Sequence, residues 1–222
     1  GSAGTGNYSF EWTSIPAGFS STQQSPTASP TVTTKYVVAV TSGACVAYDT
    51  VSVYARTLPA SDFQLNPPVV CEGQVVSLLY TGLPTPGDTY SWDFSNGNVL
   101  SGSGSGPYNV SWDTSGEDVV TLTVTDIFGC SSSHSENVLV NLTPTVSFTS
   151  ITGGCEPLLV DFTNTSEGGF TYEWDFGDGT TSTDQDPSHT YAAGVYDVSL
   201  AVTSAEGCMA SLNYPAYIEV LS

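Results

Sequence analysis

The sequence predicts an all-β protein made of repeated modules of sandwich or barrel type. Val, Tyr, Phe, Trp and Thr, which favour strands, are frequent, while Gly, Pro, Ser and Thr interrupt every candidate amphipathic helix. Short strand-like runs lie between turn signals along the whole chain. A unit of aromatic strand, valine-rich strand and cysteine recurs, which indicates a tandem repeat. Its three tryptophan–cysteine pairs are Trp12 and Cys45, Trp92 and Cys130, and Trp174 and Cys208.

The clearest single element is the stretch Phe170–Gly179. Tyr172, Trp174 and Phe176 alternate with polar residues, and this period of two predicts a strand with one aromatic, core-facing side. The following Gly177-Asp178-Gly179 predicts a tight hairpin turn, because glycine tolerates the positive φ that such turns need.

The repeat divides the 222 residues into three modules. Residues 1–56 are expected to be an incomplete module with only its closing strands, in which Thr33–Thr41 pairs with Ala47–Tyr54. Residues 57–141 and 142–222 are expected to be two further modules, joined by short proline-containing linkers that limit bending.

The charge balance is strongly acidic. Lys35 and Arg56 stand against 22 acidic residues, which gives a formal net charge of −20. Such a surface repels nucleic acid and anionic membranes, so we expect no nucleic-acid partner. No apolar run approaches the length of about 20 residues that a membrane helix needs, so we expect no membrane insertion by this segment. The acidity favours solubility and repulsion between modules, with divalent-cation binding as the alternative.

The five cysteines predict disulfides and therefore an oxidising compartment: periplasm, cell surface or medium. Cys71 and Cys130 occupy the same places in their module as Cys155 and Cys208 in the next, so the spacing predicts one bridge within each module. Cys45 matches the second cysteine of such a pair. A fragment that begins inside a module explains it best, and a free thiol and an intermolecular bridge are the alternatives.

We expect no cofactor, with calcium as the alternative, and four aspartates near the hairpin are its candidate ligands. Asp175 and Asp178 flank one turn, and Asp184 and Asp186 could join them if the following loop folds back. A tight hairpin offers no cleft for two catalytic carboxylates, and Asp is a common turn residue, so a structural role is expected. We expect His189 to tie a loop by hydrogen bonds, and we predict no catalytic residues.

Exposed aromatic side chains are the candidates for contact with a polysaccharide or a protein. The tryptophan of each repeat is expected to be buried. Trp112, Tyr108 and Tyr214 are the residues predicted to reach a ligand.

The last module resembles a polycystic-kidney-disease (PKD) domain, a family with an immunoglobulin-like β-sandwich fold. Its residues 172–180 read Y-E-W-D-F-G-D-G-T, residues 187–191 read P-S-H-T-Y, and residues 194–198 read G-V-Y-D-V. The middle module resembles divergent members, with Ser95-Asn96-Gly97 in place of G-D-G and Ser111-Trp112-Asp113 near the position of H-T-Y. The resemblance implies tandem Ig-like/PKD-like sandwiches.

Acidic, cysteine-containing PKD-like strings of this kind resemble repeats of large Bacteroidota surface proteins, among them gliding-motility adhesins and other type IX secretion cargo. The resemblance implies a non-catalytic stalk or spacer of an extracellular, outer-membrane-associated adhesin. Its partners would be surface polysaccharide or protein, or neighbouring modules of the same chain. The alternative is an accessory polysaccharide- or protein-binding module of a secreted hydrolase.

Overall fold

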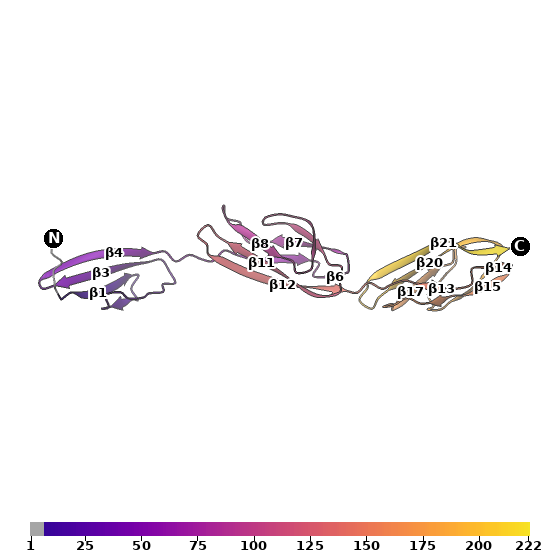
Figure 1. Ribbon diagram of the computed structural model, residues 1–222, viewed down its shortest axis with the longest axis horizontal. Helices are drawn as coiled ribbons and strands as arrows, with labels where there is room; N and C mark the ends of the chain where they lie inside the picture. Colours follow the sequence, from indigo (N-terminus) through magenta and orange to yellow (C-terminus); the bar gives the residue numbers. More distant parts are fainter. Residues whose placement is uncertain (1–6) are drawn as a thin grey trace. The chain divides into compact units, whose positions relative to one another are not determined.

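The computed structural model describes residues 7–222, which form β-strands joined by turns and contain no helix (Figure 1). The predicted all-β fold class is confirmed. The chain divides into two compact units, Gly1–Leu58 and Pro59–Ser222. The second unit contains two separate hydrophobic cores. We refer to its residues 59–141 as module two and to its residues 142–222 as module three.

Unit one is an antiparallel sheet in the order β2-β1-β3-β4. Its longest hairpin joins β3 to β4 with Ser42 opposite Cys45, as the alternating pattern predicts. Tyr36 and Val38 are buried on one face of β3, and the ring of Phe19 meets Tyr36 edge-on at 5.3 Å. The strands are β1 Ser9–Ile15, β2 Ser20–Ser21, β3 Thr34–Ser42 and β4 Cys45–Val53.

Module two is a sandwich of two four-stranded sheets, β5-β7-β10-β9 and β6-β12-β11-β8. Its core contains the alternate residues of β11, Val120, Leu122 and Val124, all without exposed surface, packed against Val76 and Leu78 of β7. Its strands are β5 Phe63–Asn66, β6 Val69–Cys71, β7 Val75–Tyr80, β8 Thr89–Asp93, β9 Asn98–Ser101, β10 Tyr108–Ser111, β11 Gly116–Thr125 and β12 Ser131–Asn141.

Module three has the same layers, with a five-stranded sheet β14-β21-β20-β17-β18. The opposing layer consists of the pairs β13-β16 and β15-β19. Trp174, Phe162 and Leu200 lie in its core with at most 2% of their surface exposed. Its strands are β13 Phe148–Thr149, β14 Gly153–Cys155, β15 Leu158–Asp161, β16 Thr163–Asn164, β17 Thr171–Asp175, β18 Thr181–Ser182, β19 Ser188–Tyr191, β20 Gly194–Thr203 and β21 Met209–Leu221.

The repeated tryptophan plays one structural role in all three repeats. Each indole N–H donates to a backbone carbonyl in the loop ten to twelve residues later. The bonds are Trp12 to Gln23 at 3.1 Å, Trp92 to Gly104 at 3.1 Å and Trp174 to Asp184 at 3.0 Å. Because the polar tip is satisfied by a loop, the ring can pack inward while it fixes that loop. Trp174 is fully buried as predicted. Trp12 and Trp92 are only partly buried, so the prediction of a buried tryptophan is wrong for these two repeats.

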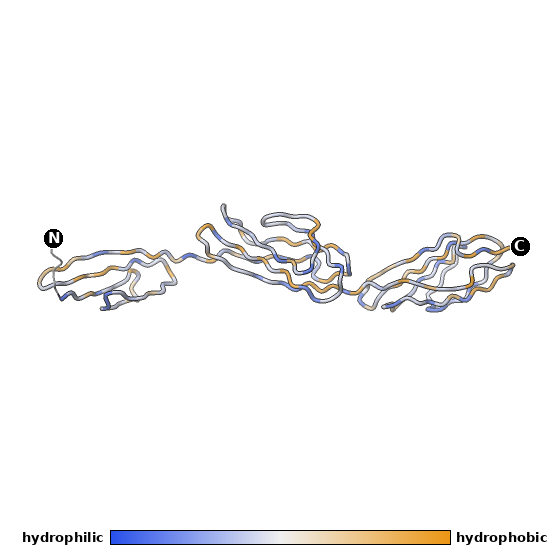
Figure 2. The backbone as a smooth tube through the Cα atoms, in the orientation of Figure 1, coloured by the Kyte–Doolittle hydropathy of each residue, from blue (hydrophilic) through white to orange (hydrophobic). Residues whose placement is uncertain are grey.

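Hydrophobic and polar residues are interspersed along the strands, as a half-buried sheet requires (Figure 2). Within residues 7–222, no helix has the length and apolar character needed to cross a membrane.

Candidate functional site

The loop between β17 and β18 is held by its own acidic side chains. Asp175 pairs with Thr181, so residues 176–180 form the loop. Oδ1 of Asp175 accepts the N–H of Gly177 at 2.9 Å. Phe176 is 2% exposed and continues the aromatic face of β17 into the core. The loop is therefore wider than a two-residue turn, because its first residue is still anchored in the core.

The two glycines of this loop have different reasons to be glycine. Both have positive φ, +81° at Gly177 and +89° at Gly179. A Cβ on Gly177 would lie 2.2 Å from the carbonyl oxygen of Asp197, whereas a Cβ on Gly179 would meet nothing within 4 Å. In module two the matching residue is Ser95, with φ 52°, whose hydroxyl donates to the carbonyl of Val119 at 2.7 Å. That close approach between loop and strand is thus a feature of both modules.

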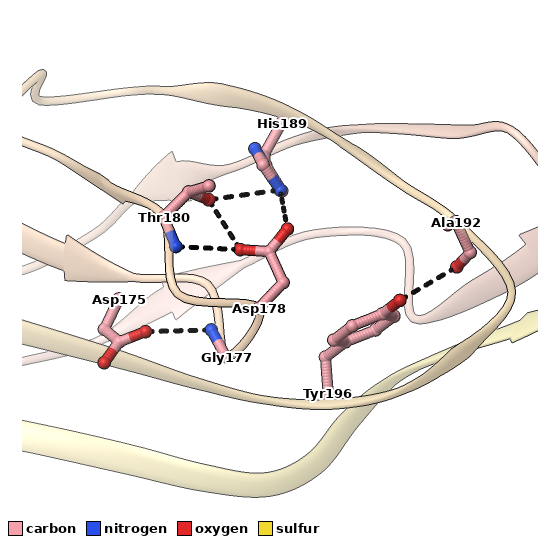
Figure 3. A network of polar contacts seen from close by, with 7 residues as sticks. All are labelled: Asp175, Gly177, Asp178, Thr180, His189, Ala192 and Tyr196. Atoms are coloured by element: carbon pink, nitrogen blue, oxygen red, sulfur yellow. Dashed lines mark hydrogen bonds and ion pairs between the residues drawn. The ribbon is translucent and has the colours of Figure 1, made fainter.

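Asp178, Thr180 and His189 form a polar network across the loop (Figure 3). Oδ1 of Asp178 accepts the backbone N–H of Thr180 at 3.0 Å and its hydroxyl at 2.6 Å. Oδ2 lies 2.8 Å from Nε2 of His189, whose ring stacks on Phe176 with centroids 4.4 Å apart. The network joins the loop to β19, which is the loop-tying role predicted for this histidine.

The network does not have the geometry of a proton relay. In a nucleophile–imidazole–carboxylate triad, the hydroxyl and the carboxylate contact opposite ring nitrogens. Here both lie on Nε2 of His189, the hydroxyl of Thr180 at 3.4 Å. Partial burial acts to raise the pKa of Asp178, but the hydrogen bonds from Thr180 and His189 outweigh it and hold that pKa below its usual 3.8. The carboxylate is therefore kept ionised, as a fixed acceptor.

The four candidate calcium ligands are engaged in separate local hydrogen bonds. Besides the contacts of Asp175 and Asp178, Oδ2 of Asp184 accepts from Ser182 at 3.4 Å, and Oδ1 of Asp186 accepts the N–H of Asn164 at 2.8 Å. Among residues 7–222, no three or more His, Cys, Asp or Glu side chains are grouped so that they could hold a metal ion.

The three candidate ligand-contact aromatics do not form one platform. Trp112 is 1% exposed and lies in the core of module two, so its prediction as a ligand contact is wrong. Tyr108 is half-buried against the same core. Tyr214 is 38% exposed in module three, where one ring face stacks on Tyr217 at 5.1 Å and an edge contact of 5.3 Å joins it to Phe148. Of the three, Tyr214 keeps the largest exposed fraction that a ligand could reach.

The cysteines pair across the modules. The disulfide joins Cys71 of module two to Cys208 of module three, with Cα atoms 5.6 Å apart. Cys45, Cys130 and Cys155 are free thiols. The predicted bridges within each module are wrong, although Cys71 and Cys208 are correctly predicted to be oxidised.

Strand pairing explains the correction. Cys71 ends β6, which runs parallel to β12 and places it opposite Asn141, the last residue of that strand. Cys130 precedes the first residue of the same strand, so the length of β12, roughly 35 Å, separates the two sulfurs. A disulfide requires Cα atoms within about 7 Å. In module three, Cys155 lies opposite Leu221 at the end of β21 in the same way.

A glutamate next to the bridge also holds the junction. Oε1 of Glu72 accepts the N–H of Ser115 at 2.9 Å, and Oε2 accepts the N–H of Thr143 at 3.1 Å. The sulfur of Cys208 lies 3.9 Å from the carbonyl oxygen of Asn141. One carboxylate therefore ties a loop of module two to the first residues of module three, beside the disulfide.

Comparison with known proteins identifies module three. Residues 141–220 match the family model described as a PKD domain. The chain is 35% identical to the PKD1 domain of Vibrio anguillarum Epp, over 36% of this chain and 99% of that one, with a TM-score of 0.32. Module three is therefore a PKD domain. The PKD1 domain of the Vibrio cholerae metalloprotease PrtV is 33% identical over 35% of this chain and 98% of that one, with a TM-score of 0.30.

A curated relative is a microbial collagenase of Vibrio alginolyticus, 49% identical over 49 residues. The match spans 22% of this chain and 6% of the length of that collagenase. The PKD domain is a non-catalytic module, also found as a part of enzymes. PKD domains are typical of extracellular or secreted proteins.

Sequence reasoning missed Glu72 and the partner of Cys71. The available signal was the dipeptide Cys-Glu, which occurs at 71–72 and again at 155–156, at the same place in each module. A repeated charged residue beside a repeated cysteine indicates a shared environment at the module end.

Proposed function

We propose that this chain is a non-catalytic spacer in a cell-surface multi-domain protein, where it carries an adhesive part away from the cell. The supporting observation is the cross-module disulfide between Cys71 and Cys208. A spacer must transmit tension without lengthening, and a covalent bridge between successive modules provides that property.

The path of tension follows from the position of the bridge. When the chain is pulled from its two ends, force that enters module two at Pro59 reaches Cys71, crosses to Cys208 and leaves at Ser222. The residues enclosed by the bridge, with a sequence separation of 137, carry no tension. Most buried residues of both hydrophobic cores lie within this protected segment, and Phe63, Val70, Ile218 and Val220 lie outside it.

Single-molecule force spectroscopy on the full chain tests this role. With the bridge intact, unfolding of the second unit should release only residues 59–71 and 208–222, roughly 95 Å of contour length. Under reducing conditions the release should grow by roughly 450 Å, because the enclosed residues become extensible. The double variant Cys71→Ser, Cys208→Ser should behave like the reduced protein. Equal extension in oxidised and reduced protein would refute the spacer mechanism.

The resemblance to repeats of gliding-motility adhesins supports a more specific version of this proposal. The parent would be a Bacteroidota adhesin, exported by type IX secretion and held at the outer membrane, and it would serve adhesion or gliding. An antibody to this chain, used on cell-surface and medium fractions, tests it. A very large cell-associated polypeptide is expected, and a modest polypeptide free in the medium would overturn it.

The similarity to a collagenase and a metalloprotease favours a second candidate, an accessory binding module of a secreted hydrolase. The half-exposed Tyr214 is the side chain that would contact a polysaccharide or protein. Sedimentation of the full chain with fibrillar collagen or an insoluble polysaccharide tests it. Binding that is lost in Tyr214→Ala supports this candidate, whereas binding unchanged by that substitution, or no binding to either material, counts against it.

A further inference from the structure

Modules two and three carry cysteines at the same two places, and the bridge between them takes one cysteine from each place. The cysteine at the exit end of module two, Cys71, pairs with the cysteine in the turn before the last strand of module three, Cys208. Cys155 occupies the exit end of module three and is free. We propose that Cys155 is the docking cysteine for the next module in series, which bridges to it through a cysteine at the place of Cys208.

The equivalence of Cys155 and Cys71 rests on strand register. Cys71 ends the short strand β6 and lies opposite Asn141, the last residue of β12. Cys155 ends β14 and lies opposite Leu221, the last residue of β21. Both pairs are parallel, so each cysteine is at the point where the chain leaves its module.

The glutamate after each cysteine repeats the same backbone bond. The N–H of Glu72 donates to the carbonyl of Asn141 at 3.1 Å, and the N–H of Glu156 donates to the carbonyl of Leu221 at 2.9 Å. At the existing junction, the Glu72 carboxylate also accepts the N–H of Thr143, two residues beyond Asn141. By analogy with Glu72, we expect the Glu156 carboxylate to accept the N–H two residues beyond Leu221 when a further module is attached.

The complementary cysteine also sits in a repeated turn. The N–H of Cys208 donates to Oγ of Ser204 at 3.2 Å, and the N–H of Cys130 donates to Oδ1 of Asp126 at 2.9 Å, each four residues earlier. Cys208 is fully buried at the junction. Cys130, which has no bridge, is only partly buried. Modules two and three therefore both present their second cysteine in a turn held by the same type of hydrogen bond.

The two equivalent exit cysteines differ in exposure, as expected if a following module covers one of them and not the other. Cys71 is partly buried where module three follows, and Cys155 is exposed. The exposed thiol, the repeated glutamate and the repeated register together specify the partner: another module of this kind, attached after Ser222.

The proposed step is disulfide exchange with a small disulfide such as oxidised glutathione. The Cys155 thiolate attacks this disulfide, which releases one glutathione thiolate and forms a mixed disulfide. The thiolate of the incoming module then displaces the second glutathione. One protein disulfide forms, two protein thiols lose their protons, and the two electrons reduce oxidised glutathione to two thiols.

A tandem extension of the full chain tests this inference. Residues 143–222 are added directly after Ser222, so that Leu221-Ser222-Thr143 reproduces the junction Asn141-Leu142-Thr143. In the added copy, Cys155→Ser removes its own exit thiol, and Met209→Leu at an exposed position gives its Cys208 peptide a distinct mass. The protein is equilibrated with oxidised and reduced glutathione and mapped by mass spectrometry without reduction.

The expected result is a disulfide between Cys155 and the mass-marked Cys208, with Cys45 and Cys130 as the remaining thiols. A control with Cys155→Ser in the first copy should leave the marked Cys208 as a free thiol. The inference is overturned if Cys155 and the marked Cys208 both stay reduced, or if Cys155 bridges to the unmarked Cys208 of its own module. The result does not depend on the spacer role, because pairing is read without any force or adhesion assay.

Discussion

Replacing Gly177 by alanine should destabilise module three far more than the same change at Gly179. The two residues lie in one loop, two positions apart, and both have positive φ. For a residue with a Cβ, this backbone region costs about 1 kcal/mol at either position. Comparing the two alanine variants therefore separates the energetic cost of backbone strain from the cost of steric contact.

The steric part is specific to Gly177. Its added Cβ would lie 2.2 Å from the carbonyl oxygen and 3.0 Å from the amide nitrogen of Asp197, which are backbone atoms of β20. That strand cannot easily retreat, because Oδ1 of Asp197 accepts the N–H of Ala216 at 2.7 Å and so joins it to β21. Forced overpacking of this kind costs about 1–3 kcal/mol. We expect Gly177→Ala to lower the free energy of unfolding by about 3 kcal/mol and Gly179→Ala by about 1 kcal/mol.

Hydrogen exchange of the full chain measures the difference locally. Peptides from β17 and β20 report opening of module three, and peptides from β11 serve as an internal control in module two. Protection in β17 and β20 should fall strongly in Gly177→Ala, slightly in Gly179→Ala, and not at all in β11. Equal losses of protection in the two variants would refute the argument, since they would mean that the steric contact with Asp197 adds nothing to the destabilisation.

Three further variants test other contacts. Because the folded-state pKa of Asp178 is lowered, its stabilisation is present above the ordinary pKa of 3.8 and is lost as pH falls through the lower, folded value. Acid denaturation below about pH 4 should therefore be shallower in Asp178→Asn, and an unchanged profile would contradict this assignment. The hydroxyl of Tyr191 is buried without a partner among the described residues, and burial raises its pKa. Tyr191→Phe should leave the unfolding free energy unchanged or raise it by about 1 kcal/mol, and a clear loss in chemical denaturation would disprove this. Glu72→Ala should remove two charge-assisted bonds and expose the amide of Thr143 to faster hydrogen exchange, with a loss of about 2 kcal/mol, whereas Glu72→Gln should retain part of the protection.

Local patterns predicted the strands and the aromatic cores because both depend on the two-residue alternation of side chains along a strand. The alternation in β17 correctly placed Trp174 and Phe176 in the core. The same period of two places Trp112 with Val110 on the inner face, where the structure has both side chains buried. The partner of Cys71 was not predictable in this way. It depends on the parallel pairing of β6 with the end of β12, and pairing between distant strands leaves no trace in local periodicity.

The cross-module bridge also orders events during biogenesis. Cys208 follows Cys71 by 137 residues, so the bridge can close only when both modules have reached the oxidising compartment in which disulfides form. Once module two has folded, the length of β12 keeps Cys71 away from Cys130, so the early thiol has no partner within its own module. The Cys71 thiol therefore stays without its partner until the turn before β21, which contains Cys208, is present. The bridge between Cys71 and Cys208 thus closes only after module three is present, and the oxidation state of Cys71 records whether that module has been delivered.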